Sequence, residues 1–301
     1  MFTKHYRVGG HLLEIIFEND GMGEELIPSF RPFVLTEPVG DEQPLFTLSV
    51  QPGFRFEGER DEVGQFDGSG NNYGVYQVPG GGYYIEISNP AQKLCGTLLA
   101  DKGFLHCRVS FMAEEPANQA FALNNSLMMA YAFAASGHQT VLMHASVIRK
   151  DGYGYLMTAP SGTGKSTHTF LWYKNIPGCD LMNDDNPVVR IVDGEAIIYG
   201  TPWSGKTPCY RNIQAPVGAI VRIQQRKKNE IRRMRPIESL AQLLPAASSM
   251  KWDESVYMGV CDTLSTIIAK VGIYELGCLP DADAAWLCYN TVGVKSDEVK
   301  E

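Results

Sequence analysis

The chain has 301 residues, of which 44% are hydrophobic and 20% charged, and its formal net charge is −8. These values are typical of a soluble globular protein with one large domain or two modest ones. The negative charge argues against non-specific binding of nucleic acid or of anionic membranes.

Residues 1–113 are predicted to form a β-rich N-terminal domain. Short runs rich in β-branched and aromatic residues predict strands at 46–51, 73–78, 82–88, 93–100 and 104–111. The glycine-rich pieces at 67–72 and 79–82 lie between such runs, and they are interpreted as hairpin turns rather than ligand loops.

The pattern changes near residue 114, and residues 114–301 are predicted to form a second, α/β domain. Pro116 and the helix formers after it predict a helix that ends at Gly137. Two strands joined by a turn at 150–152 follow. Beyond them the pattern predicts a helix at 166–175, strands within 179–200 and 216–225, a helix at 253–271, and a strand and closing helix from 273 onward.

The segment between the second of those strands and the next helix resembles a phosphate-binding loop. Residues 159–166 read A-P-S-G-T-G-K-S and match the pattern G-x-x-x-x-G-K-[ST] except at the first glycine. The glycines let backbone N–H groups turn toward a phosphate, the lysine reaches the β- and γ-phosphates, and the serine can hold Mg²⁺. The predicted nucleotide-binding residues are Ala159, Pro160, Ser161, Gly162, Thr163, Gly164, Lys165, Ser166 and Thr167.

Three polar residues near the loop are candidates for phosphoryl-transfer chemistry. Asp184 and Asp185 follow a short apolar run. Phosphoryl transfer to a hydroxyl needs one carboxylate to orient Mg²⁺ or its waters and a base to take the proton. Without the loop, an Asp-Asp-Asn sequence would be interpreted as a polar turn. His144 lies in an apolar strand, where a histidine is usually structural, but a hairpin would bring it beside the phosphates.

These segments resemble the HPr kinase/phosphorylase family in order and spacing. The resemblance covers about residues 139–290 and rests on "MHAS", "PSGTGKST", "NDDNPVV" and the closing "IYELGCLPDADAAWL". It implies a mixed-sheet core of the phosphoenolpyruvate carboxykinase type. It also implies that Lys165 grips the phosphates, Ser166 and Asp184 hold Mg²⁺, and Asp185 is the base with His144 beside it.

The sequence departs from the family after the double carboxylate. The family has a metal-binding Glu there, whereas residues 199–212 contain no carboxylate, which puts the second Mg²⁺ ligand and the reverse reaction in doubt. Four residues of this segment are candidates for a substrate or γ-phosphate clamp, with an ordinary loop as the equal alternative: Ser204, Lys206, Arg211 and Asn212.

The run at 222–235 carries seven Lys or Arg residues and one Glu. It is interpreted first as a solvated hairpin that turns near Lys228 and Asn229, because charge runs usually mark exposed faces. The alternative is a surface for an acidic partner or for nucleotide phosphates.

The function predicted from these residues is an ATP-dependent, Mg²⁺-requiring kinase that acts on a hydroxyl of a protein serine or a small molecule. One alternative is a carboxykinase, which the short chain and the lack of a recognisable Lys/His pair for a second metal disfavour. Another is a non-catalytic ATP-binding regulator, which the missing Glu leaves open.

Partners other than ATP or ADP and the acceptor are not indicated, although relatives of this fold often form homo-oligomers. A cytoplasmic location is expected. The N-terminus lacks the apolar run of a signal peptide, and the apolar segment 126–137 is shorter than the about 20 residues of a membrane span. The seven scattered cysteines, without a C-x-x-C pair, indicate reduced thiols and no zinc site.

Overall fold

Two units can be distinguished in the computed structural model, which describes residues 1–18, 24–68, 71–205 and 207–293. The first unit contains Met1–Ala135 and Met250–Val256, and the second contains Ser136–Ser249 and Tyr257–Glu301. The sequence-based boundary at 113/114 lies before a helix that the structure places in the first unit. No helix of the described residues is both long enough and apolar enough to cross a membrane.

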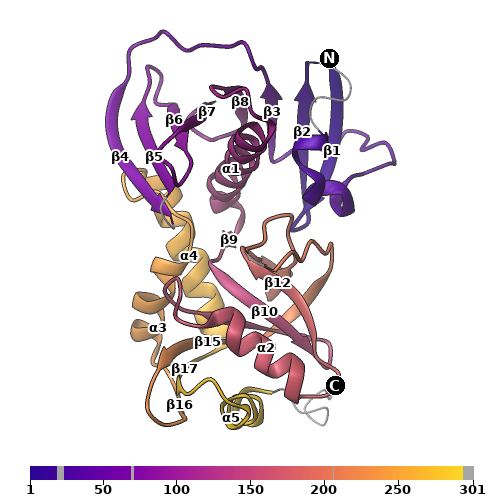
Figure 1. Cartoon of the computed structure of the whole chain (residues 1–301), viewed down its shortest axis with the longest axis vertical. Coiled ribbons are helices and arrows are strands. Elements are labelled where there is room, and N and C mark those ends of the chain that lie inside the picture. Colours follow the sequence, from indigo (N-terminus) through magenta and orange to yellow (C-terminus); the bar gives the residue numbers. More distant parts are fainter. Residues whose placement is uncertain (19–23, 69–70, 206, 294–301) are drawn as a thin grey trace. The chain divides into compact units, whose positions relative to one another are not determined.

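The first unit is an eight-stranded sheet with one long helix. The strand order is β1-β2-β3-β8-β7-β6-β5-β4, with β2–β3 and β3–β8 parallel and the other pairs antiparallel (Figure 1). The elements are β1 (Phe2–Val8), β2 (His11–Phe17), η1 (Glu24–Leu26), η2 (Pro28–Phe33), β3 (Phe46–Val50), β4 (Asp61–Gly68), β5 (Asn71–Gln77), β6 (Tyr83–Ser88), β7 (Leu94–Ala100), β8 (His106–Phe111) and α1 (Pro116–Ala134).

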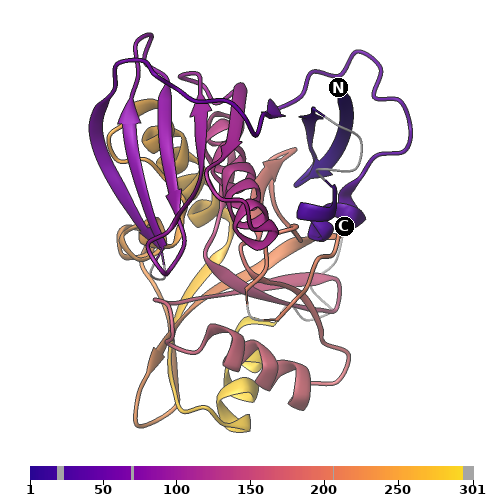
Figure 2. The ribbon, with the colours of Figure 1, turned by 45° about the horizontal axis from the view of Figure 1, so that its top comes forward.

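Helix α1 packs along one face of this sheet, as Figure 2 shows. The approach is close because β7 carries Gly96 where the helix carries Ala122. A Cβ added at Gly96 would lie 2.6 Å from the Ala122 Cβ. A larger residue at this position would therefore push the helix away from the sheet.

The second unit is built on a mixed sheet with the path β12-β10-β11-β15-β14-β13-β9, to which β17 and β16 are added beside β15. Strands β11, β15 and β17 are parallel and the other pairs are antiparallel. The elements are η3 (Ala135–His138), β9 (Thr140–Leu142), β10 (Ala145–Lys150), β11 (Tyr153–Thr158), α2 (Lys165–Asn175), β12 (Asp180–Asp185), β13 (Val188–Val192), β14 (Glu195–Tyr199), β15 (Gln214–Gln225), β16 (Glu230–Arg233), α3 (Pro236–Leu243), η4 (Leu244–Ala246), α4 (Glu254–Lys270), β17 (Gly272–Cys278) and α5 (Ala282–Val292). The chain is thus a mixed α/β protein with two mixed sheets.

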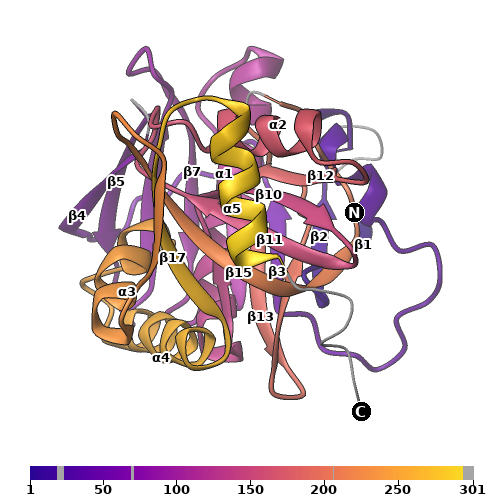
Figure 3. The same cartoon turned by 90° about the horizontal axis from the view of Figure 1, so that it is seen from below.

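Two apolar cores sandwich the sheet of the second unit, and Figure 3 shows the helices that cover it. Helices α2 and α5 pack on one face, with Trp172 and Cys288 against Tyr155 and Leu276. On the opposite face, the core contains side chains of α3 and α4 together with apolar residues of the same strands. Because the strands are buried on both faces, they read as continuous apolar runs rather than as alternating patterns.

The predicted turn between β10 and β11 is confirmed, and it determines where His144 lies. Asp151 and Gly152 both have positive φ, 49° and 83°, which is the two-residue turn that matches strand twist. The register then pairs Ala145 with Thr158. The residue before β10 and the loop after β11 are consequently at the same end of the sheet.

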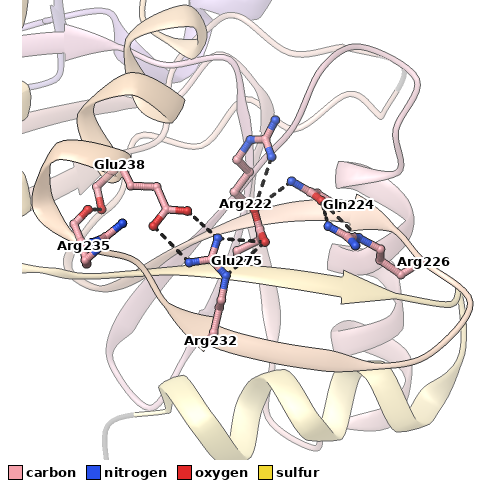
Figure 4. A network of polar contacts seen from close by, with 8 residues as sticks. Arg222, Gln224, Arg226, Arg232, Arg235, Glu238 and Glu275 are labelled. Atoms are coloured by element: carbon pink, nitrogen blue, oxygen red, sulfur yellow. Dashed lines mark hydrogen bonds and ion pairs between the residues drawn. The ribbon is translucent and has the colours of Figure 1, made fainter.

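The hairpin predicted for the basic run is wrong. Strand β16 pairs antiparallel with β17, about forty residues later in the chain, and it does not pair with β15. Part of the positive charge of the basic run is neutralised by carboxylates of neighbouring elements, as Figure 4 shows. Arg222 and Arg232 both lie against Glu275, at 3.7 and 3.1 Å, and Arg232 also binds Glu238.

Candidate functional site

The phosphate-binding-type loop lies between β11 and α2, as its sequence predicts. Gly162 and Gly164 have φ of 77° and 117°, which side chains other than glycine rarely adopt. Ala159 has no such φ, so the loop keeps its course without the first glycine of the pattern. Helix α2 begins at Lys165, and its first-turn N–H groups form a site suited to an anion.

The side chain of Lys165 is buried and turns back over the loop. Its Nζ donates to the carbonyl oxygen of Ala159 at 3.2 Å and lies 2.7 Å from Nε2 of His144. Burial lowers the pKa of the Lys165 ammonium, whereas the carboxylates of Asp185 and Asp184 act in the opposite direction. A further anion at the loop would stabilise the charged form.

His144 joins the loop lysine to the second carboxylate. Its Nδ1 lies 3.1 Å from Oδ1 of Asp185 while its Nε2 faces Lys165. An ammonium can only donate, so Nε2 is the acceptor and the ring proton is on Nδ1, from which it is donated to Asp185. About a third of the His144 and Asp185 side chains is exposed, so this chain of contacts is partly open to solvent.

Ser166 and Asp184 form the second link between the loop and the double carboxylate. The Ser166 hydroxyl donates to Oδ1 of Asp184 at 2.8 Å, and Asp184 is buried. Hydroxyl and carboxylate oxygens are the ligands that Mg²⁺ prefers, with phosphates and waters completing its shell. The pair therefore fits a magnesium ion. No group of three or more His, Cys, Asp or Glu suited to a metal occurs among the described residues.

The backbone around the double carboxylate is fixed by hydrogen bonds. Asn183 is fully buried, its side-chain amide lies 3.1 Å from the Thr201 hydroxyl, and its Oδ1 accepts from the Asn186 backbone N–H. Asp185 has φ of 129°, a conformation that costs roughly 1–3 kcal/mol for a residue with a side chain. Gly205 lies against it, since a Cβ there would be 3.2 Å from the Asp185 Cβ.

The candidate clamp residues after β14 have different surroundings, and only Arg211 of the described ones lines the second of the two pockets beside α2. The Ser204 hydroxyl donates to the Asp184 carbonyl oxygen at 2.9 Å and accepts from the Cys209 N–H. Arg211 binds Asp180 at 2.5 Å and the Leu181 carbonyl oxygen. Asn212 is exposed, and Lys206 lies outside the described residues.

Two pockets open beside the N-terminus of α2, and they share no lining residue. The first, of about 510 Å³, lies on the side of the loop glycines Gly162 and Gly164. The second, of about 480 Å³, borders Ser166 and Asp184 and is lined on one side by the exposed aromatics Phe170 and Tyr173. Ligands of metabolite size fit volumes of this order.

The sequence-predicted residues that the structure brings together are His144, Lys165, Ser166, Asp184 and Asp185. Sequence reasoning predicted some of the residues that line the two pockets, such as Gly162 and Ser166, and missed others, among them His168 on α2 and Ser146 on β10. For His168 a signal was present, because a residue three positions after Lys165 lies on the same helix face as the lysine.

Comparison with known proteins gives little beyond this geometry. No family model matches the chain, and no curated protein sequence matches it. A solved structure of the HPr(Ser) kinase/phosphatase from Coxiella burnetii is similar to 50% of this chain and 93% of that one, with 14% sequence identity and a TM-score of 0.30. A likeness of this size does not show that the chain belongs to that family.

Proposed function

We propose that the chain is an ATP-dependent kinase that transfers the γ-phosphate to a hydroxyl group. One observation carries the proposal: two polar residues of the loop motif are linked to the double carboxylate, Lys165 through His144 to Asp185 and Ser166 directly to Asp184. A phosphate-binding loop without chemistry would need no such links. We also propose that the second unit has the carboxykinase-type core, which its mixed sheet and the hairpin leading into the loop support.

In this proposal the phosphates of ATP lie on the loop. The first-turn N–H groups of α2 and the Lys165 ammonium bind their oxygens, and charge-assisted hydrogen bonds of this kind are stronger than neutral ones. The approach of the phosphates replaces the Lys165–His144 contact with a stronger ion pair. His144 continues to donate a hydrogen bond from Nδ1 to Asp185, and this bond holds the carboxylate in place.

Transfer follows from the position of Asp185. The acceptor oxygen bonds to the γ-phosphorus while the bond from that phosphorus to the β–γ bridging oxygen breaks, and ADP leaves. Asp185 takes the proton of the acceptor hydroxyl. Magnesium, held by Ser166 and Asp184, would neutralise phosphate charge. The second pocket, which borders Asp184, offers about 480 Å³ for the acceptor.

The test is phosphate transfer from labelled ATP to serine, threonine, sugars and cell-extract protein, comparing the parent with Asp185→Asn. The variant should bind ATP as the parent does but transfer roughly 10²–10⁴-fold more slowly, because an amide cannot accept the proton. Asp193→Asn is the matched control, since Asp193 is exposed in the β13–β14 turn at φ of 50°, where Asn fits well.

Each result has a defined meaning. Equal transfer rates in the parent and Asp185→Asn would show that Asp185 is not the base. Tight ATP binding by a parent that transfers to no acceptor would favour the regulator alternative. Formation of phosphoenolpyruvate from oxaloacetate would favour a carboxykinase. Asp184→Asn should raise the Mg²⁺ concentration needed for transfer.

A further inference from the structure

The pocket on the glycine side of the loop has the composition of a site for an uncharged ring joined to an anion. Apolar side chains, among them Leu171, Ile223, Leu279 and Pro280, line it, and no Asp or Glu is part of the lining. Its charged residues are Arg226 and Lys227, from the connection between β15 and β16. In a chain with a net charge of −8, such a lining is selective for a ligand with negative charge.

His168 lines this pocket, and one nitrogen of its buried ring has no hydrogen-bond partner in the described part of the chain. Its Nε2 accepts from the Trp172 indole N–H at 3.2 Å, and an indole can only donate. The ring is 2% exposed, and burial lowers its pKa to about 4, so the ring is neutral at pH 7. The remaining proton must therefore be on Nδ1, and this atom has no hydrogen-bond partner among the described residues.

An unpaired buried donor is costly, and native proteins seldom keep one without a use. The first turn of α2 places His168 next to Thr167 and the loop glycines that line the same pocket. A ligand that lies on the loop and extends into the pocket would therefore lie beside this ring.

Two lining residues of the pocket, Arg226 and Leu279, are held by hydrogen bonds to residues outside the lining. Asn229 donates to Asp281 at 2.9 Å and accepts from the Leu279 N–H at 2.8 Å. Gln224 orients Arg226, whose guanidinium donates to the Gln224 Oε1 at 2.8 Å, while Gln224 donates to Glu275 (Figure 4). The polar network of β15, β16 and β17 thus orients the guanidinium of Arg226, which lines the pocket.

We propose that this pocket holds the nucleoside of ATP and that His168 donates a hydrogen bond from Nδ1 to it, with Arg226 and Lys227 facing the phosphate end. The inference rests on the proposed function, because it takes ATP as the ligand of the loop. It assigns the basic run at 222–235 a part in nucleotide binding that its interpretation as a solvated face did not include.

The test compares two ligands of the full chain by calorimetry in the presence of Mg²⁺: ATP and inorganic tripolyphosphate, which lacks the nucleoside. His168→Leu should weaken ATP binding about ten-fold, the loss expected for one hydrogen bond in a buried site, and leave tripolyphosphate binding unchanged. His168→Asn should bind ATP nearly as the parent does, since the Asn amide can donate from about the position of Nδ1. Lys165→Ala should weaken both ligands.

Trp172→Phe removes the indole that fixes the His168 proton on Nδ1, so it should weaken ATP binding in the same direction as His168→Leu and leave tripolyphosphate binding unchanged. Equal weakening of ATP and tripolyphosphate by His168→Leu, or no weakening of either, would overturn the role of His168. A parent that binds tripolyphosphate as tightly as ATP would overturn the nucleoside pocket while leaving the loop assignment intact. A parent that binds neither ligand would overturn the proposed function itself.

Discussion

At the scale of single residues, Lys165 is the group on which nucleotide binding depends most. Its side chain is buried, which lowers its pKa, and the hydrogen-bond neighbours of its ammonium in the described part of the chain are the Ala159 carbonyl and His144. The first of these is neutral and the second can be displaced. The lysine is thus poised for a stronger anionic partner, which the phosphates of a nucleotide would supply.

Lys165→Ala should weaken binding of ATP in the presence of Mg²⁺ by roughly ten- to a hundred-fold, the value of a charge-assisted hydrogen bond that is not replaced. Titration calorimetry measures this directly. Lys174→Ala, an exposed position on the same helix, removes the same charge from the protein and should change the affinity little. Equal affinity in the parent and Lys165→Ala would refute the assignment of the loop.

The burial of His168 also leads to a prediction about the pH dependence of stability. Its pKa is about 4 in the folded chain and about 6.5 in the unfolded chain. Between these values the unfolded state binds more protons, so the contribution of His168 is complete above pH 6.5 and is lost as the pH falls toward 4. The expected loss is about 3 kcal/mol in the free energy of unfolding.

Urea unfolding at pH 7 and pH 4, in the parent and in His168→Leu, isolates this contribution from that of the acidic residues. The difference in unfolding free energy between the two proteins should shift in favour of the variant as the pH is lowered. A difference that does not depend on pH would mean that the imidazole is not buried in its neutral form.

At the same scale, the sequence predicts which residues meet but not how they are held. The motif and the double carboxylate are sufficient to expect Lys165, Ser166 and Asp184 together. The strained φ of Asp185 and the close approach of Gly205 depend on a loop about twenty residues later, and no local pattern shows them. The His168 donor likewise exists only because Trp172 occupies the other ring nitrogen.

At the scale of elements, the sequence patterns predict most of the buried strands and the long helices, but they miss β2 and α3 as well as the edge strands β1 and β4. All five strands predicted in the first unit are confirmed, whereas β1, β2 and β4 were not predicted individually. Strand β4 has five acidic or glycine residues in its sequence D-E-V-G-Q-F-D-G. It is an edge strand, which needs no apolar face on both sides. The pairing predicted for β16 was wrong because its partner β17 is distant in sequence and because the residues of β16 are mostly charged.

The start of α5 is an element boundary whose energetic value can be measured. The Asp281 carboxylate accepts from the Ala284 N–H at 2.8 Å as the N-cap and also accepts from Asn229. Asp281→Ala should lower the free energy of unfolding by about 1–2 kcal/mol. Asp283→Ala is the control: Asp283 is exposed in the first turn, and its loss should cost less than about 1 kcal/mol. If Asp281→Ala and Asp283→Ala lower the free energy of unfolding equally in thermal or urea unfolding, the N-cap hydrogen bond does not stabilise the protein as predicted.

At the scale of the whole molecule, the proposed chemistry requires only the second unit. The loop, both carboxylates and the two pockets beside α2 consist of residues between 144 and 280. The first unit has its own sheet and helix and a separate pocket of about 620 Å³. Binding of ATP should therefore be visible as a local change in the chain.

Hydrogen–deuterium exchange of the full chain with and without ATP and Mg²⁺ tests this prediction. Slower exchange is expected at 159–168, where backbone N–H groups would bind phosphate, and at 226–229 and 279–281, which line or tie the first pocket. Exchange in β5 to β8 of the first unit should not change. Lys165→Ala at the same ATP concentration is the control and should show little protection.

Protection confined to the first unit would place the nucleotide elsewhere. Protection at the loop without protection at 226–229 would mean that the phosphates bind as proposed while the nucleoside remains outside the first pocket.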